Sequence, residues 1–167
     1  MLSNGTFEAD SKGVGWPDGW SHPNGSTWEK EGDTRFISLR SSKPDDTVLV
    51  YRLLNLPSPP PPALEIRLRV RYADIKRGEN AWFDGGIIGH FKNMEGKVIK
   101  PEPSAPSFTG TSKGWVDKSY IVKVPSSARS LELMPCLFQA AGDEGQRKDE
   151  EDQPRKLTTW IWNRLHR

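Results

Sequence analysis

The sequence is poor in the residues and motifs that catalytic and metal-binding sites usually require. Its 167 residues include a single cysteine, Cys136, which excludes an internal disulfide and any metal cluster built from cysteines. The three histidines are scattered, and no Gly-x-Ser-x-Gly elbow, His-Glu-x-x-His helix or glycine-rich phosphate loop is present. Acidic residues are plentiful, but no pair stands out as the two carboxylates of a glycosidase. We therefore expect that the protein is not an enzyme.

The chain also lacks a large net charge and long apolar runs. Its 24 lysines and arginines nearly balance 22 acidic residues, which leaves a net charge of +2 and no strong field toward nucleic acid or a membrane surface. No apolar run approaches the roughly 20 residues of a membrane span. The opening residues, Asn4-Gly5-Thr6-Phe7-Glu8, do not form a signal peptide. We expect no nucleic-acid or membrane partner, and either a cytoplasmic protein or a module separated from a longer exported one.

Strand and turn patterns dominate the sequence. Between positions 64 and 72 apolar residues alternate with Glu65 and three arginines, which predicts a strand with one apolar and one charged face. Residues 48–56 are apolar on both faces and predict a central strand, whereas Pro135 predicts a bulge or a sheet edge. Further strands are expected at 35–40, 81–91, 97–100, 120–124 and 131–138. The pattern predicts an all-β protein, a two-layer antiparallel β-sandwich of the jelly-roll type, with a closed barrel as the alternative.

The pattern changes after Gly142. Residues 143–156 are charged at 10 of 14 positions and carry too little apolar surface to order themselves. Residues 157–162 are β-branched and aromatic, and they could add a strand or form an exposed tail. We divide the chain into a β-sandwich domain, 1–142, and an irregular charged tail, 143–167.

Aromatic residues are concentrated near the start of the chain, in Trp16-Pro17-Asp18-Gly19-Trp20 and at Trp28. Glycine and proline break this stretch, so it predicts turns and short strands rather than a helix. Flat indole rings are suited to stacking on the C–H faces of sugar rings. The same rings could equally belong to the core.

Six short segments resemble the jelly-roll carbohydrate-binding modules that are appended to bacterial glycoside hydrolases, in particular the xylan- and glucan-binding group: Asn4 to Glu8, Gly15 to Trp20, Ala81 to Asp84, the hairpin from Phe91 to Val98, Gly114 to Val116, and Leu131 to Pro135. The resemblance covers about residues 3–142. It implies a non-catalytic module that binds a polysaccharide beside a neighbouring catalytic domain or cell-surface protein, in an extracellular or periplasmic setting. It also implies a structural calcium ion with Glu8 as a ligand, although the family's closing Asp-Asp pair is absent here.

The predicted sugar-binding residues combine aromatic plates with polar groups. If Phe83 and Ile87 point inward, then Trp82, Asp84 and His90 share the other face of their strand. Asp84 and His90 would lie about 20 Å apart and contact different parts of an oligosaccharide. The complete predicted set is Trp16, Trp20, Trp82, Asp84, His90, Trp115, Tyr120 and Arg69.

Arg69 belongs to a stripe with Arg67 and Arg71 that has two interpretations. It is either an ordinary solvated strand face or a dock for an anionic polysaccharide, such as a uronate, through bidentate guanidinium contacts. Two other functions also stay open for the whole chain. One is a protein-interaction or structural β-sandwich whose tryptophans are core residues, and the other is a small jelly-roll hydrolase.

Overall fold

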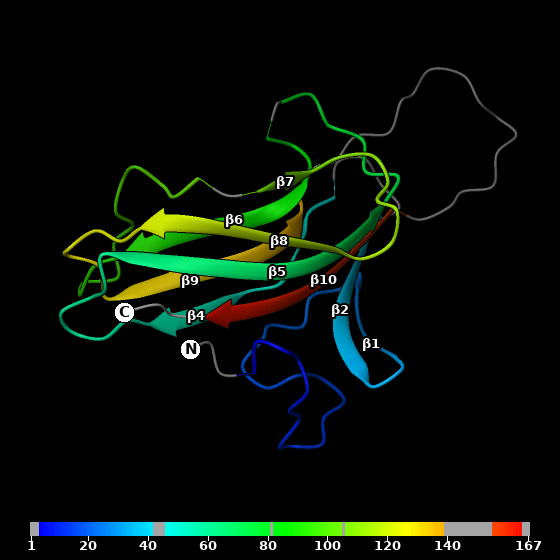
Figure 1. The fold of residues 1–167 in the computed structure, drawn as a ribbon, viewed down its shortest axis with the longest axis horizontal. Coiled ribbons are helices and arrows are strands. Elements are labelled where there is room, and N and C mark those ends of the chain that lie inside the picture. The colour runs from blue at the N-terminus through cyan, green and yellow to red at the C-terminus, as the bar shows by residue number, and fades with distance from the viewer. Residues whose placement is uncertain (1–3, 42–45, 81, 105, 139–154, 165–167) are drawn as a thin grey trace, which may run out of the picture.

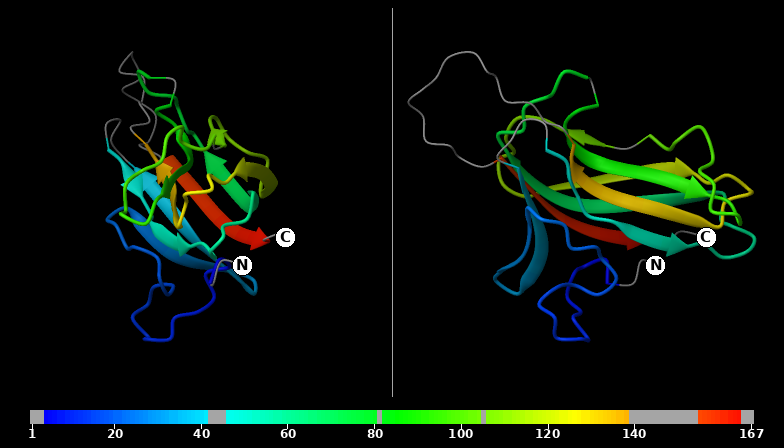
Figure 2. Two further views of the ribbon diagram at one scale, coloured as in Figure 1. Left: turned by 90° about the vertical axis from the view of Figure 1, so that its left-hand side faces the viewer. Right: turned by 180° about the vertical axis from the view of Figure 1, so that it is seen from behind.

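The computed structural model describes residues 4–41, 46–80, 82–104 and 106–138, together with the backbone of 155–164. Every regular element in these segments is a strand, and the strands form two stacked antiparallel sheets (Figure 1; Figure 2). The predicted two-layer β-sandwich is thus confirmed. None of the described residues belongs to a helix that could cross a lipid bilayer.

Sheet A contains five strands in the order β1-β2-β10-β5-β8. Their bounds are β1 Ser26–Glu31, β2 Thr34–Ser41, β5 Ala63–Ala73, β8 Val116–Lys123 and β10 Arg155–Arg164. The alternation that predicted β5 is confirmed, since Leu64, Ile66, Leu68 and Val70 are buried while the residues between them face outward. Burying one such aliphatic side chain contributes about 1.5–3 kcal/mol.

Sheet B has the order β3-β9-β6-β7, and β4 also pairs with β9. Its bounds are β3 Val48–Leu49, β4 Arg52–Asn55, β6 Gly85–Lys92, β7 Ser107–Phe108 and β9 Ser130–Leu137. The apolar faces of the two sheets enclose one core, in which Ile87 and Phe91 of β6 and Leu131 and Leu133 of β9 are buried. The predicted returning strand at 97–100 is reduced to a single bridge between Lys92 and Val98.

Two strand positions in sheet B differ from the prediction. Residues 48–56 split into β3 and β4 and lie at the edge of the sheet, whereas β9 lies between them and β6. Pro135 therefore sits in a central strand. Its carbonyl accepts a hydrogen bond from Val50 (2.9 Å), so its nitrogen faces the same side, where the neighbouring strand is interrupted. The missing N–H of Pro135 thus coincides with the interruption between β3 and β4, and β9 itself does not lie at a sheet edge.

Strand β10 corrects part of the predicted C-terminal tail. Its backbone pairs with β2 on one side and with β5 on the other, so it lies inside sheet A. The prediction of a tail outside the sandwich is wrong for these ten residues, and the alternative of an added strand holds. The β-branched and aromatic composition of 157–162 favours this pairing. The boundary at Gly142 and the charged residues up to 154 lie outside the described residues.

Candidate functional site

The N-terminal tryptophans lie in the core. Trp16 and Trp20 are each 6% exposed. The Trp20 indole N–H donates to the Asn4 carbonyl (3.1 Å), and its ring contacts Phe7 at a centroid distance of 4.9 Å. Trp16 donates to the Trp20 carbonyl (3.1 Å) and stacks on His22 at 3.8 Å. Neither ring has an open face, which corrects the prediction that both are sugar plates.

A tight turn holds these rings in place. Gly19 has a φ of +76°, and a side-chain carbon there would lie 1.9 Å from a guanidinium nitrogen of Arg52. That nitrogen donates to the Asp18 carbonyl (2.6 Å), and the guanidinium lies 5.6 Å from the Trp20 ring. The Trp-Pro-Asp-Gly-Trp motif thus packs into the core around a buried arginine.

Two other aromatic side chains also pack against the core. Trp28 donates its indole N–H to the Phe7 carbonyl (2.9 Å), and the Arg35 guanidinium lies 4.0 Å from the centre of its ring. Tyr120 of β8 is half-buried against the core, and burial raises the pKa of its phenol. The prediction that Tyr120 is a sugar-stacking residue is therefore wrong, because its ring faces inward.

Trp115 and Arg69 lie on the outer face of sheet A. The Trp115 ring meets Phe36 at 70°, its N–H donates to Glu31 (3.4 Å), and Arg71 lies 4.8 Å from its centre. Arg69 is half-exposed, with its Nε 3.7 Å from an Asp117 carboxylate oxygen.

The other two arginines of the stripe are paired more closely. Arg67 Nε lies 2.7 Å from Glu65, and an Arg71 nitrogen lies 2.9 Å from Glu31. These pairs favour the interpretation of a solvated strand face over an anion dock.

Glu8 does not fit the calcium site that the resemblance implies. One of its carboxylate oxygens accepts the backbone N–H of Arg35 (3.1 Å), which ties the N-terminal segment to β2. Within the described segments, no three histidine, cysteine, aspartate or glutamate side chains are grouped so that they could hold a metal ion. Calcium prefers six to eight oxygen ligands, so Glu8 alone is a poor site.

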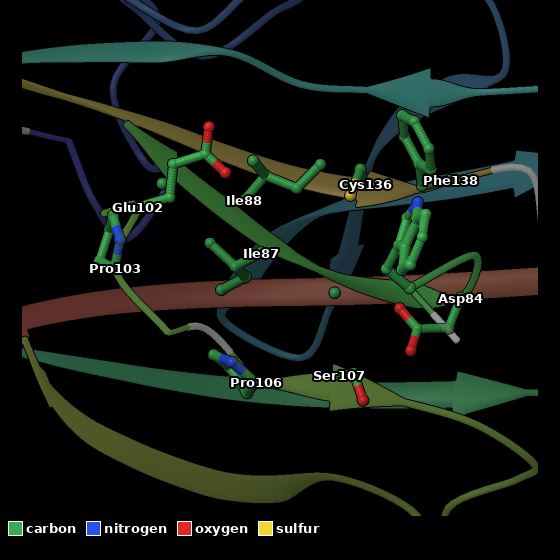
Figure 3. Close-up of a pocket in the computed structure, with 12 residues that line it drawn as sticks. Asp84, Ile87, Ile88, Glu102, Pro103, Pro106, Ser107, Cys136 and Phe138 are labelled. Atoms are coloured by element: carbon green, nitrogen blue, oxygen red, sulfur yellow. The ribbon is translucent and has the colours of Figure 1, made fainter. Parts of the chain in front are cut away.

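The outer face of sheet B carries an open groove of about 280 Å³ along β6. Figure 3 shows Glu102 and Pro103 at one end and Asp84 and Phe138 at the other. The segment that precedes β7 forms one wall, and it can lie close to β6 because Gly86 has no side chain. A side-chain carbon at Gly86 would lie 3.0 Å from the Pro106 carbonyl oxygen. A side chain at this position would push the Pro106 backbone away from β6 by a few tenths of an ångström.

Trp82 lines this groove and is 67% exposed. Among the described residues it is the one aromatic side chain in the set of exposed large hydrophobic residues. Its ring meets Phe83 at 85° with a centroid distance of 6.0 Å, and Phe83 in turn contacts Phe138 at 5.5 Å. The two phenylalanines thus support an indole that stays open to solvent, as a stacking platform requires.

Asp84 lies in the same groove and is only 6% exposed. Its Oδ2 is buried and has no hydrogen-bond partner in the part of the chain that the structure describes. Burial raises the pKa of Asp84, against the opposing effects of the Ser107 hydroxyl and the Arg77 charge. A buried acceptor of this kind is costly for the fold unless a ligand or water satisfies it.

His90 lies farther along the same face, beyond the Glu102 end of the groove. Its two ring nitrogens are each 3.5 Å from a carboxylate oxygen, Nε2 from Glu102 and Nδ1 from Glu132. Glu132 also accepts from Tyr51 (3.1 Å) and from Lys92. Burial alone would raise the pKa of Glu132, but these hydrogen bonds together hold it below its ordinary value.

The sequence-based set is therefore divided by the structure. Trp82 and Asp84 meet in one groove, and His90 contacts Glu102 at its far end. Sequence reasoning missed Glu102, Phe138 and the wall before β7. The cluster of prolines at 101, 103 and 106 was the one available signal of an extended wall.

Comparison with known proteins places this geometry in context. No protein-family model matches the chain, and no curated protein matches it. The fold is similar to the carbohydrate-binding module TmCBM61, solved in complex with β-1,4-galactotriose, with a TM-score of 0.54 and 9% identity over 98% of this chain and 97% of that one. The chain has the jelly-roll fold of carbohydrate-binding modules.

Two further structures extend the comparison. A family 16 carbohydrate-binding module matches with a TM-score of 0.50 and 12% identity, over 90% of this chain and 92% of the other. The enzymatically active domain of tailspike protein 4 from bacteriophage CBA120 gives a TM-score of 0.58 and 11% identity over 99% of this chain. The present chain spans about a fifth of the tailspike, as its 21% coverage shows. At these identities the likeness shows the fold.

Proposed function

We propose that this chain is a non-catalytic polysaccharide-binding module that stacks a sugar ring on Trp82 in the groove of sheet B. The observation that carries the proposal is the exposed Trp82 indole beside the buried, unpartnered Asp84 oxygen. An indole face covers the C–H face of a pyranose, and sugar hydroxyls need acceptors close to that face. Trp82 supplies the stacking face and Asp84 supplies the acceptor, and both lie in a single groove.

The shape of the groove suits a chain ligand better than a small enclosed one. Its volume of about 280 Å³ lies near the lower limit of about 300 Å³ for ligand pockets. It is open along its length, so a polysaccharide could lie in it with further residues extending beyond each end. A single stacked ring gives modest affinity, which attachment to an enzyme or cell surface would multiply through local concentration.

The position of the carboxylates supports binding rather than hydrolysis. Asp84 and Glu102 lie at opposite ends of the groove (Figure 3). Glu102 is already paired with Lys100, and that pairing lowers its pKa, which is the wrong direction for a general acid. We infer that the module serves a neighbouring glycoside hydrolase or cell-surface protein in an extracellular or periplasmic setting.

Affinity electrophoresis tests the proposal directly. The wild-type protein is run through gels that contain xylan, β-glucan, mannan or β-1,4-galactan, and the Trp82→Ala variant is run beside it. We expect retardation by at least one polysaccharide and a loss of affinity of about tenfold or more in the variant, because the stacking surface is gone.

The matched control is Ile121→Ala. This substitution also removes an exposed apolar side chain, but from β8 of the other sheet. It should leave retardation unchanged. Migration that no polysaccharide slows, or equal loss in both variants, would contradict the proposed function.

A further inference from the structure

The described lining of the groove is acidic, and two lysines near it are paired with glutamates. Within the described part of the chain, its lining contains two carboxylates, Asp84 and Glu102, and no lysine or arginine. Lys100 is paired with Glu102, and Lys92 with Glu132. The positive charge of Arg77 lowers the pKa of Asp84, but burial outweighs it. A ligand in this groove therefore meets a carboxyl group at each end and no lysine or arginine in the described lining.

The two buried carboxylates on this face of sheet B differ in one decisive respect. Glu132 receives hydrogen bonds from Tyr51 and Lys92 and lies 3.5 Å from His90, so its charge is satisfied within the protein. Asp84 is buried to a similar extent, yet its Oδ2 has no partner among the described residues. The free acceptor lies in the groove, beside the exposed indole.

From this difference we propose that the groove selects uncharged sugars and that Asp84 is its specificity-determining residue. Asp84 Oδ2 accepts a hydrogen bond from a hydroxyl of a neutral glycan whose ring is stacked on Trp82. A uronate or sulfate at the same position would bring a second negative charge toward a buried carboxylate, and the described lining of the groove holds no lysine or arginine that could pair with it. This inference rests on the proposed function and narrows its ligand to neutral polysaccharides.

The arginine stripe on sheet A does not contradict this choice. Its members lie on the opposite sheet, where Arg67 and Arg71 are paired with glutamates. Any binding of an anionic glycan there would be independent of Trp82. Binding in the groove is therefore taken as the binding that Trp82→Ala abolishes, and selectivity is compared on that part alone.

The experiment compares each neutral polysaccharide with its own acidic form. β-1,4-Galactan, mixed-linkage β-glucan and glucomannan are each presented unmodified and after oxidation of the C6 hydroxyl to a carboxylate, in affinity gels at low ionic strength. We expect the Trp82-dependent affinity for at least one neutral polymer to exceed the affinity for its oxidised form by about tenfold or more. An effect of this size corresponds to one hydrogen bond to a charged group.

The Asp84→Asn variant isolates the charge. It keeps the size of the side chain, and it should weaken binding of the neutral polymer and reduce the preference over the oxidised polymer to within about threefold. Glu132→Gln is the matched control on the same face and should leave the preference unchanged. Glu102→Gln, at an exposed position, should lower the preference partway and covers the case in which Asp84→Asn does not fold.

The outcomes separate the two proposals. If no neutral polymer binds, the proposed function fails. If a neutral polymer binds through Trp82 but its oxidised form binds equally well, the inference about Asp84 fails while the proposed function stands. The inference also fails if Asp84→Asn folds and retains the full preference for the neutral form.

Discussion

The tryptophans of the N-terminal segment and the tryptophan of the groove are held in opposite ways. Trp16, Trp20 and Trp28 each donate the indole N–H to a backbone carbonyl, and their rings pack against the core. Trp82 stands on the outer face of sheet B with two thirds of its surface exposed. The dense cluster of aromatic residues is therefore structural, and the isolated tryptophan is the candidate for recognition.

The hydrogen bonds explain this division. Indole N–H groups that satisfy loop carbonyls hold a long irregular segment in place without strands or helices. The amide of Asn4 works in the same way, since its oxygen accepts from the Ala9 N–H (2.8 Å) and its nitrogen donates to the Ala9 carbonyl (2.9 Å). Aromatic residues in such a segment form a small core of their own. Their number in the sequence is thus a poor guide to the binding surface.

The largest effect is expected from removing β10, on which both regions depend. Truncation after Gly142 would leave β2 and β5 without their shared partner in the middle of sheet A. The truncation creates two unpaired strand edges and opens the core. The free energy lost in this way should exceed the whole free energy of unfolding of a domain, which is about 5–15 kcal/mol. We expect loss of the cooperative thermal transition, measured by circular dichroism. A truncated protein that melts within a few degrees of the full chain would show that both tryptophan regions stand without β10.

A pair of tryptophan substitutions tests the comparison itself. Trp20→Ala should lower the free energy of unfolding by about 3–5 kcal/mol, because it leaves a cavity against Phe7 and frees the Asn4 carbonyl. Trp82→Ala should change it by no more than about 0.5 kcal/mol, because the side chain is mainly in solvent. Urea unfolding measures both values. Equal losses in the two variants would end the distinction between structural and exposed tryptophans.

Local patterns in the sequence predicted the strands but not their order. The alternation in β5 is read correctly because period two reports one buried face. The apolar run at 131–138 also predicted β9, which is buried on both faces, whereas the strand expected at 81–91 begins only at Gly85. The edge position of residues 48–56 was not predictable, since pairing order depends on contacts between distant segments. The same limit applies to β10, whose pairing with β2 and β5 follows a highly charged stretch.

The candidate site was predictable only within one strand. The expected strand alternation placed Trp82 and Asp84 together, but both residues precede β6, which begins at Gly85. The burial of Ile87 agrees with the prediction, whereas Phe83 is half-buried against Trp82 and Phe138 instead of lying in the core. Glu102 reaches the groove from another segment, so no local pattern could include it. That Asp84 Oδ2 has no hydrogen-bond partner among the described residues is likewise a property of the folded chain.

The weakest effect concerns thermal stability and the two buried carboxyl groups of sheet B, Asp84 and Glu132. Burial raises the pKa of Asp84 above its ordinary value of 3.8, so the folded protein binds this proton more tightly than the unfolded chain does. Stability from this group therefore falls as pH rises from about 3.8 through the pKa of the folded state, and the cost persists at neutral pH. Asp84→Asn should remove that cost.

The contribution of Glu132 to stability changes with pH in the opposite direction. Its pKa is held below the ordinary 4.5, so its contribution is present above that pH and is lost as pH falls through the pKa of the folded state. At pH 7 we expect the melting temperatures to rank Asp84→Asn above wild type and Glu132→Gln below it. Both differences should shrink as the pH is lowered toward 3, in scanning calorimetry of the three proteins. A shift of both variants in the same direction would mean that Asp84 is satisfied as fully as Glu132, and the groove would then lose its free acceptor.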